Sequence, residues 1–252
     1  MRENRVRTAW AEGRGAITAW LTIANSYSAE LHAAEDFDAI TVDVQHGMVN
    51  YQQAYEMMQA ISTGSPAPFA RVPWNDPAAI MKMLDGGAYG IVCPMINSRE
   101  ECERFVGACR YAPTGYRSFG PARGLLHGGP DYFEHANETI VTLAMIETRQ
   151  ALDNLDEIVA VDGLDAVYIG PNDLAISLGY PPAGEPEAQE VIDAVGTIFE
   201  KSKKAGVRAG IHVPSGDSAR RRVDEGFDFC AIANDAKLLT AAAQREIAAF
   251  RG

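Results

Sequence analysis

The stretch AVYIGPNDLAISLG, residues 166–179, reads as a strand, a turn and a helix in succession. Its first four residues are apolar and favour a buried strand, which Gly170 and Pro171 then end. The following residues have helical apolar spacing, and proline is favourable at the first position of a helix. Asp173 therefore follows the carboxyl end of a strand, where parallel sheets carry their functional groups. The stretch predicts a βα unit with a carboxylate at its functional end.

The same alternation of strand and helix runs along the whole chain, which is typical of parallel βα units. Strands are expected at residues 16–23, 39–44, 67–72, 89–93, 140–146, 166–169, 207–213 and 229–232. Eight parallel strands favour an α/β fold closed into a (β/α)8 TIM barrel, and 252 residues is a usual length for one such barrel. No low-complexity linker divides the chain, so residues 1–252 are expected to form a single barrel domain.

Several helix boundaries carry sequence signals. Asp76 and Pro77 predict a helix start, and Ser98 with Glu101 predicts a capping box. Apolar residues at helical spacing predict a helix over residues 187–204. Residues 111–137 are rich in Gly and Pro and too long for an ordinary connection, so they are expected to form a functional loop or a mobile insertion.

Composition excludes several classes of protein. With 47% hydrophobic residues and no apolar run near the ~18 residues that span a bilayer, a soluble protein without a membrane partner is expected. A net charge of −12 argues against nucleic-acid binding, and an anionic ligand would need a metal ion or a specific arginine in its site. The four cysteines form no CxxC motif, and the apolar stretch AITAWLTIA lacks a clear cleavage site. Reduced thiols and a cytoplasmic location are therefore expected.

Two acidic residues follow neighbouring predicted strands. Glu147 ends the largely apolar run IVTLAMIET, and Asp173 follows the next strand. Adjacent parallel strands lie about 4.8 Å apart, so both carboxylates can reach one cation. Carboxylates without a nearby histidine or cysteine favour Mg²⁺ or Mn²⁺ over zinc. The alternative is that Asp173 only caps a helix and Glu147 pairs with an arginine, and the spacing alone leaves both interpretations open.

Three more residues are candidates for the chemistry. His46 closes the second predicted strand and is suited to proton transfer near neutral pH, with a purely structural role as the alternative. Asp85 falls at the expected end of a helix, where its charge opposes the helix dipole, so a cationic partner such as His46 is expected. Arg71 ends the third strand and could bind a carboxylate or steady an oxyanion, or form a salt bridge within the barrel.

The positions of the lysines bear on the mechanism. All five, Lys82, Lys201, Lys203, Lys204 and Lys237, fall in predicted helices. A Schiff-base enzyme needs a desolvated lysine in the barrel mouth, so imine chemistry is disfavoured. Carbonyl chemistry in this chain would then need a metal ion as the electrophile.

Motifs spread over nearly the whole chain resemble those of the HpcH/HpaI family of 4-hydroxy-2-oxo-acid aldolases. They are DFDAITVDVQHG, PFARVPWNDPAAIMKMLDGGAYGIVCPMI, YAPTGYRSFGPARG and MIETRQALDNLDEIVAVDGLDAVYIGPNDLAISLG. The resemblance implies a class II aldolase that reversibly cleaves 4-hydroxy-2-oxo acids to pyruvate or hydroxypyruvate and an aldehyde. It also implies a homo-hexamer, a trimer of dimers, in which the C-terminal helix is exchanged between subunits.

The same resemblance implies roles for individual residues. Glu147 and Asp173 would bind Mg²⁺ or Mn²⁺, with Co²⁺ as a further candidate and no organic cofactor. His46 would be the base, paired with Asp85, and Arg71 would contact the keto and enolate oxygen. The turn formed by Gly170, Pro171 and Asn172 would lie beside the substrate carboxylate.

Some residues depart from the family pattern or leave the function open. Many relatives have Glu and Gln where this chain has Gln45 and Met145, so donor preference and metal affinity are open. Arg117 and Arg123 could read the charge of the aldehyde or contact a neighbouring subunit, or only pin a solvated loop. Two other functions fit the same fold, namely a lyase acting on acyl-CoA substrates and a non-catalytic 2-oxo-acid-binding protein.

Overall fold

The computed structural model describes residues 1–252 and contains eight parallel strands that close into a barrel in chain order. Pairing of the first strand with both the second and the eighth leaves no open edge. The strands are β1 (Ala16–Leu21), β2 (Ala39–Asp43), β3 (Ala67–Arg71), β4 (Gly90–Cys93), β5 (Val141–Ile146), β6 (Ala166–Ile169), β7 (Arg208–Val213) and β8 (Phe229–Asn234). The predicted (β/α)8 barrel is confirmed, and every predicted strand is found.

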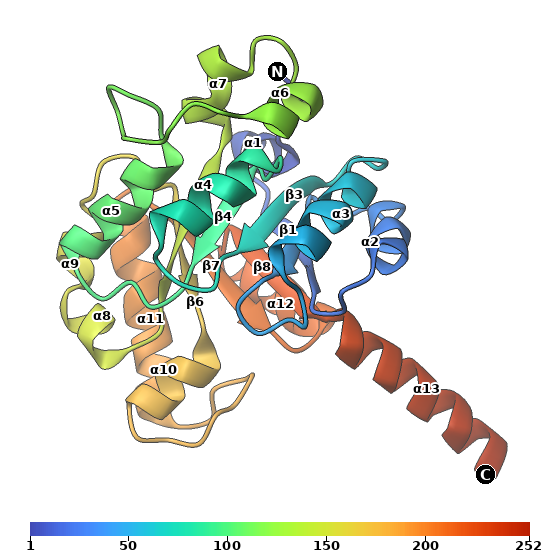
Figure 1. Ribbon diagram of the computed structural model, residues 1–252. Helices are drawn as coiled ribbons and strands as arrows, with labels where there is room; N and C mark the ends of the chain where they lie inside the picture. Colours follow the sequence, from blue (N-terminus) through green and yellow to red (C-terminus); the bar gives the residue numbers. More distant parts are fainter.

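Helices surround the barrel and extend beyond it (Figure 1). They are α1 (Arg5–Ala11), α2 (Ser26–Ala33), α3 (Tyr51–Ile61), α4 (Pro77–Asp85), α5 (Arg99–Cys109), α6 (Ala122–Gly128), α7 (Tyr132–Thr139), α8 (Arg149–Asp153), α9 (Leu155–Ile158), α10 (Pro171–Ser177), α11 (Gln189–Lys204), α12 (Gly216–Asp224) and α13 (Asp235–Arg251). The long loop predicted over residues 111–137 is wrong, because α6 and α7 occupy much of it. The glycines and prolines around these short helices hid their pattern.

The predicted helix starts are largely confirmed. Asp76 caps α4 by accepting a hydrogen bond from the backbone N–H of Ala78 at 3.1 Å, and Gly86 is its C-cap. Ser98 caps α5, but the Glu101 carboxylate accepts from the N–H of Asn97 rather than from that of Ser98. The predicted capping box is therefore only half formed. Such caps satisfy backbone groups that have no partner inside the helix.

Large side chains fill the barrel interior. Phe69 and Phe229 stack across it with ring centroids 5.7 Å apart, and Tyr168 packs edge-on against Phe229. β4 begins with Gly90, where a Cβ atom would collide with the ring of Phe69. The barrel is therefore a packed core rather than a channel. All four cysteines are buried and unpaired, as expected for reduced thiols.

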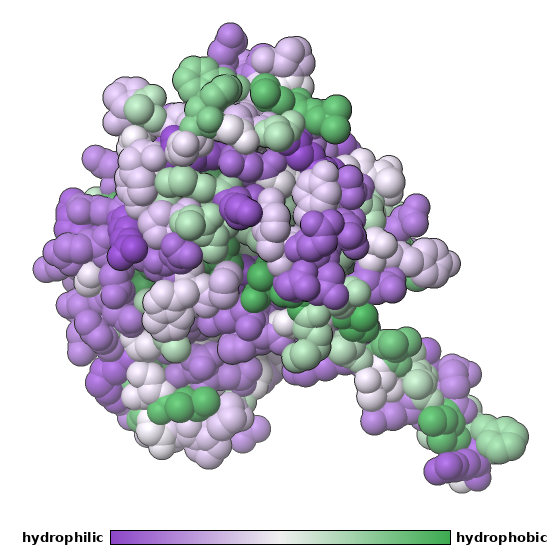
Figure 2. All heavy atoms as spheres, in the orientation of Figure 1, coloured by the Kyte–Doolittle hydropathy of each residue, from purple (hydrophilic) through white to green (hydrophobic).

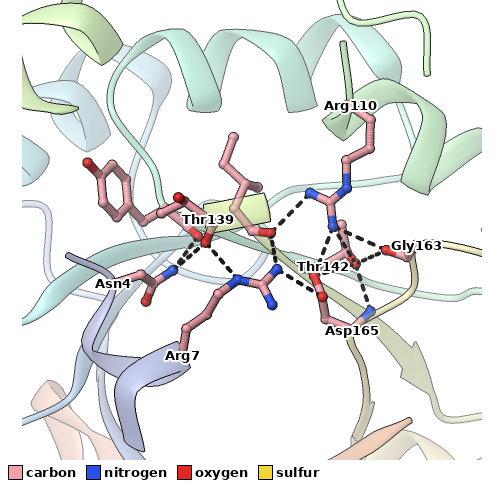
Figure 3. Close-up of polar contacts among 9 residues, drawn as sticks. Asn4, Arg7, Arg110, Thr139, Thr142, Gly163 and Asp165 are labelled. Carbon is pink, nitrogen blue, oxygen red and sulfur yellow. Dashed lines mark hydrogen bonds and ion pairs between the residues drawn. The ribbon is translucent and has the colours of Figure 1, made fainter. Parts of the chain in front are cut away.

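A partly buried polar network lies at the N-terminal end of the barrel (Figure 3). Asp165 accepts hydrogen bonds at 2.9 Å from Arg7 of α1, from Arg110 and from the backbone N–H of Thr142. Arg110 also donates to the carbonyl oxygens of Ile140 and Gly163, at 3.0 and 3.1 Å. α1, which the sequence did not predict, is thereby fastened to the starts of β5 and β6.

The last helix, α13, runs away from the barrel (Figure 1). Its start packs against β1 and β8, whereas several apolar side chains further along are exposed. Figure 2 shows these hydrophobic residues along the projecting helix, and they include Leu239, Ile247 and Phe250, which are 65%, 49% and 91% exposed. No helix of the chain has the length and apolar character needed to cross a bilayer.

Candidate active site

A pocket of about 540 Å³ opens at the carboxyl ends of the strands. Its wall comes from residues at the ends of most of the strands and from the starts of α10 and α13. Six of the residues selected from the sequence line it, namely His46, Arg71, Gly170, Pro171, Asn172 and Asp173. This is the end of a barrel at which catalytic groups are found.

The two candidate metal ligands, Glu147 and Asp173, have no cationic partner in the protein. Glu147 is only 2% exposed, and its Oε1 accepts a hydrogen bond from the backbone N–H of Met95 at 2.9 Å. Asp173 forms no hydrogen bond and no ion pair, and the N-cap of α10 is Gly170. The alternatives of a helix cap and an arginine partner therefore do not describe these carboxylates.

The surroundings of Glu147 are costly for a negative charge. Burial, together with the nearby charge of Asp173, raises the pKa of Glu147 to about 7, although the Met95 N–H and Arg71 act in the opposite direction. Met95 has a φ of 55°, and it is the only residue besides glycines with a positive φ. Strained backbone of this kind is common at functional sites. At residue 170, a Cβ atom would collide with Oε2 of Glu147, so any side chain there would displace this carboxylate.

This donor set fits a hard divalent cation. Two carboxylates close enough to affect each other electrostatically, one of them buried, gain most from a shared positive charge. No third acidic, histidine or cysteine residue joins them in a group suited to a metal ion. An ion held by Glu147 and Asp173 alone would keep open positions for substrate and water, as Mg²⁺ and Mn²⁺ sites do.

Arg71 is oriented by a residue that the sequence analysis did not select. Asp43, the last residue of β2, is 1% exposed and accepts from Nε of Arg71 at 2.9 Å and from the indole N–H of Trp20 at 3.1 Å. Burial alone would raise the pKa of Asp43, but the hydrogen bonds and charge of Arg71 outweigh it and hold that pKa below its ordinary value. The guanidinium also lies over the Trp20 ring, 5.0 Å from its centre. Asp43 and Trp20 therefore fix Arg71 at the pocket wall.

His46 lies at the pocket mouth, and Asp43 also holds its backbone. The N–H of His46 donates to Oδ1 of Asp43 at 3.1 Å, while the imidazole is exposed. The predicted pairing of His46 with Asp85 is wrong within one chain. Asp85 ends α4 near the start of β4, at the other end of the barrel, and pairs with Arg117 at 2.8 Å. The helix dipole did indicate a cationic partner for Asp85, but that partner is an arginine.

The two loop arginines are structural in this chain. Arg117 is 4% exposed, donates to the hydroxyl of Tyr132 and lies over the ring of Tyr111. Arg123 donates to the carbonyl oxygens of Gly86 and Met58, which ties α6 to α3 and α4. Neither arginine lines the pocket. Of the three roles proposed from the sequence, pinning the segment that carries them is the one that matches these contacts.

His212 and Lys237 also line the pocket, although they were not predicted from the sequence. His212 stands near the end of β7, and the rule that selected His46 and Arg71, a polar residue at a strand's carboxyl end, would have found it. Lys237 lies in the first turn of α13 and reaches the pocket rim, although all five lysines are in helices as predicted. Its side chain is exposed, so it lacks the desolvation of a Schiff-base lysine.

Comparison with known proteins gives consistent results. The family model described as HpcH/HpaI aldolase/citrate lyase matches residues 16–242. A hydroxypyruvate/pyruvate aldolase from Rhizorhabdus wittichii is 48% identical over 248 residues, which cover 98% of this chain and 99% of that protein. A 4-hydroxy-2-oxo-heptane-1,7-dioate aldolase from Shigella flexneri is 37% identical over 251 residues, covering 98% of this chain and 93% of that protein.

Solved structures have the same architecture. The crystal structure of a family protein from Burkholderia cenocepacia superposes with a TM-score of 0.90, covering 99% of this chain and 100% of that one. The two chains share 24% sequence identity, so this comparison supports the barrel fold alone.

Proposed function

The chain belongs to the HpcH/HpaI aldolase/citrate lyase family and is an enzyme of the aldolase class, and from this premise we propose the reaction and the residues that perform it. The proposed reaction is the reversible, metal-dependent cleavage of a 4-hydroxy-2-oxo acid into pyruvate or hydroxypyruvate and an aldehyde. One observation carries the proposal. The buried Glu147 and the unpaired Asp173 lie close to each other without a cationic partner, and Asp173 lines the pocket together with the fixed Arg71.

Glu147 and Asp173 would hold the divalent ion, with Mg²⁺ or Mn²⁺ as the first candidates and Co²⁺ as a third. When bound, the ion supplies a Lewis acid that polarises the keto group of the substrate and acidifies the neighbouring C–H bonds. No organic cofactor is proposed. Met145, which is 2% exposed and lines the pocket, presents no hydrogen-bonding group beside this pair, as the sequence implied.

The remaining pocket residues would bind and orient the substrate. The guanidinium of Arg71 would donate to the oxygen on which negative charge develops, and its hydrogen bond to Asp43, which fixes its orientation, supports this role. The turn formed by Gly170, Pro171 and Asn172 at the start of α10 would let the substrate carboxylate approach backbone N–H groups there. His46 would move protons at the mouth of the pocket, directly or through water. Asp85 takes no part within one chain, because Arg117 already binds it.

Removal of the metal distinguishes this mechanism from imine chemistry. Incubation with pyruvate, an aldehyde and Mn²⁺ should give an aldol product, EDTA should abolish its formation, and re-addition of Mn²⁺ should restore it. Borohydride added during turnover should neither inactivate the enzyme nor label Lys237, the one lysine at the pocket. Product formation that resists chelation, or a reduced adduct at Lys237 found by mass spectrometry, would overturn the proposal.

Replacing His46 by alanine should lower kcat about 100-fold or more, because a positioned acid or base contributes about 10²–10⁴-fold. KM for pyruvate should change little, since the substitution is expected to remove proton transfer rather than a contact that binds the 2-oxo acid. His135→Ala is the matched control, because His135 is an exposed residue of α7 outside the pocket. Steady-state kinetics of both variants check the expectation, and equal turnover of the two would exclude His46 as the base.

We further propose a cytoplasmic homo-hexamer, a trimer of dimers, in which α13 is exchanged between subunits. The exposed Leu239, Ile247 and Phe250 of the projecting helix support this proposal, because a single chain leaves them without cover.

A further inference from the structure

His212 lies on the pocket wall at the same level as the candidate metal site. The register pairs Ile146 with Ile169 and Ile169 with Ile211. Glu147, Gly170 and His212 therefore follow one another across β5, β6 and β7 at the rim. With strands about 4.8 Å apart, the backbones of Glu147 and His212 stand about 10 Å from each other. A substrate attached at the carboxylates and extending towards β7 would reach the imidazole.

The orientation of His212 is fixed by two aromatic residues. Its Nδ1 lies 3.1 Å from the hydroxyl oxygen of Tyr168, and its ring packs edge-on against Trp20 with centroids 5.2 Å apart. Trp20 in turn stacks on Tyr168, with centroids 5.6 Å apart. Tyr168 is fully buried, and His212 is the only hydrogen-bond partner of its hydroxyl group.

The contact with Tyr168 assigns the tautomer of His212. A buried hydroxyl group that did not donate its proton would leave a costly unsatisfied O–H. We therefore assign Tyr168 as the donor and Nδ1 as the acceptor, which places the imidazole proton on Nε2. Burial, with the charges of Arg71 and Lys237, lowers the pKa of His212 to about 4, so the ring stays neutral at ordinary pH. His212 is thus a fixed donor that keeps its proton.

The Nε2 atom has no partner in the protein. It makes no hydrogen bond, it is not among the fully enclosed polar atoms, and its residue lines the pocket. An N–H donor that faces the pocket discriminates between ligands, because a ligand without an oxygen at that place leaves the donor unpaired.

We propose that His212 is a specificity-determining residue whose Nε2–H donates a hydrogen bond to a substrate hydroxyl oxygen. That hydroxyl group is carried either by the carbon of the 2-oxo acid that forms the new bond or by the carbon next to the aldehyde carbonyl. The pocket then favours hydroxylated substrates over their deoxy counterparts. The hydroxyl group belongs either to the 2-oxo acid, as in hydroxypyruvate, or to the aldehyde, as in glycolaldehyde. This inference rests on the proposed aldolase function and adds the substrate class that the pocket selects.

Two pairs of substrates test the inference. In the first, kcat/KM is measured for hydroxypyruvate and for pyruvate with one common aldehyde. In the second, it is measured for glycolaldehyde and for acetaldehyde with pyruvate. His212→Phe should lower the preference for the hydroxylated substrate about tenfold in one pair, as expected for a lost hydrogen bond. Tyr168→Phe, which frees the tautomer, should lower it less, and His212→Gln, which keeps an N–H donor, should largely preserve it.

The outcomes show whether the hydroxyl group belongs to the 2-oxo acid or to the aldehyde. They also distinguish failure of the His212 inference from failure of the proposed aldolase function. A change confined to the first pair assigns the hydrogen bond to the 2-oxo acid, and a change confined to the second assigns it to the aldehyde. Unchanged preference in both pairs, in a His212→Phe protein that melts like the parent, would overturn the inference. Calorimetric binding of hydroxypyruvate and pyruvate gives the first ratio without turnover, and His212→Leu replaces a variant that fails to fold. Absence of aldol product from the parent enzyme would instead count against the proposed function.

Discussion

Replacing Glu147 by glutamine should lower kcat/KM about 1000-fold or more and remove the tight binding of Mn²⁺. Glutamine keeps the size of the side chain and can still accept a hydrogen bond from the N–H of Met95. It removes the buried negative charge that, with Asp173, would hold the cation. A metal ion that polarises a carbonyl group contributes several kcal/mol, and each ~1.4 kcal/mol corresponds to a tenfold rate effect. Turnover and Mn²⁺ calorimetry on one preparation measure both losses.

The same variant has an opposite effect on stability in the absence of metal. In the folded chain the pKa of Glu147 is raised from an ordinary 4.5 to about 7, mainly by burial. Its contribution to stability is therefore fully present below pH 4.5 and is lost as the pH rises through 7. The shift corresponds to about 3 kcal/mol in metal-free protein. Glu147→Gln should escape this loss, so above pH 7 the metal-free variant should unfold at higher urea concentration than the metal-free parent.

Glu157→Gln is the matched control, because Glu157 is an exposed residue of α9 outside the pocket. It should keep full activity, Mn²⁺ binding and the pH dependence of the parent. If Glu147→Gln retained parental Mn²⁺ affinity, Glu147 would not be a ligand, and its burial would need another explanation.

The barrel was predictable because its signals are local. The strands are short and largely apolar, and residues such as Asp76 and Gly86 mark where helices begin and end. The helices α6 and α7 escaped prediction because Gly128 and Gly129 interrupt short apolar patterns. α1 was not predicted because it is held by side-chain contacts with distant strands, such as the contact between Arg7 and Asp165. No local sequence pattern indicates such contacts.

The site was predictable only in part, for a related reason. A polar residue at the carboxyl end of a strand faces the barrel mouth whatever its neighbours are, and this rule found Arg71 and Glu147. Which residue pairs with which depends on the register between strands. β2 and β3 align Asp43 with Arg71, and the sequence alone does not contain that pairing. Asp85 illustrates the same limit, since its position called for a cation without specifying Arg117.

Replacing Asp165 by asparagine should destabilise the fold by about 3–5 kcal/mol, the usual cost of removing one partner of a buried ion pair. The carboxylate of Asp165 accepts from Arg7, Arg110 and Thr142, and the Arg110 side chain is only 3% exposed (Figure 3). The amide keeps the shape but leaves the Arg110 charge uncompensated in a buried place. Urea denaturation, with the free energy of unfolding extrapolated to water, measures the loss.

Asp156→Asn supplies the comparison that isolates burial as the cause. Asp156 also pairs with a cation, Lys201, at 2.8 Å, but its side chain is 75% exposed, and such pairs contribute about 0–1 kcal/mol. Both variants should keep the kcat/KM of the parent at a temperature where they are folded, because neither residue lines the pocket. Equal and small losses of stability would mean that water reaches Arg110 after the substitution. A large loss for Asp165→Asn alone would show that burial of the Arg110 charge, and not ion pairing as such, makes this network important for stability.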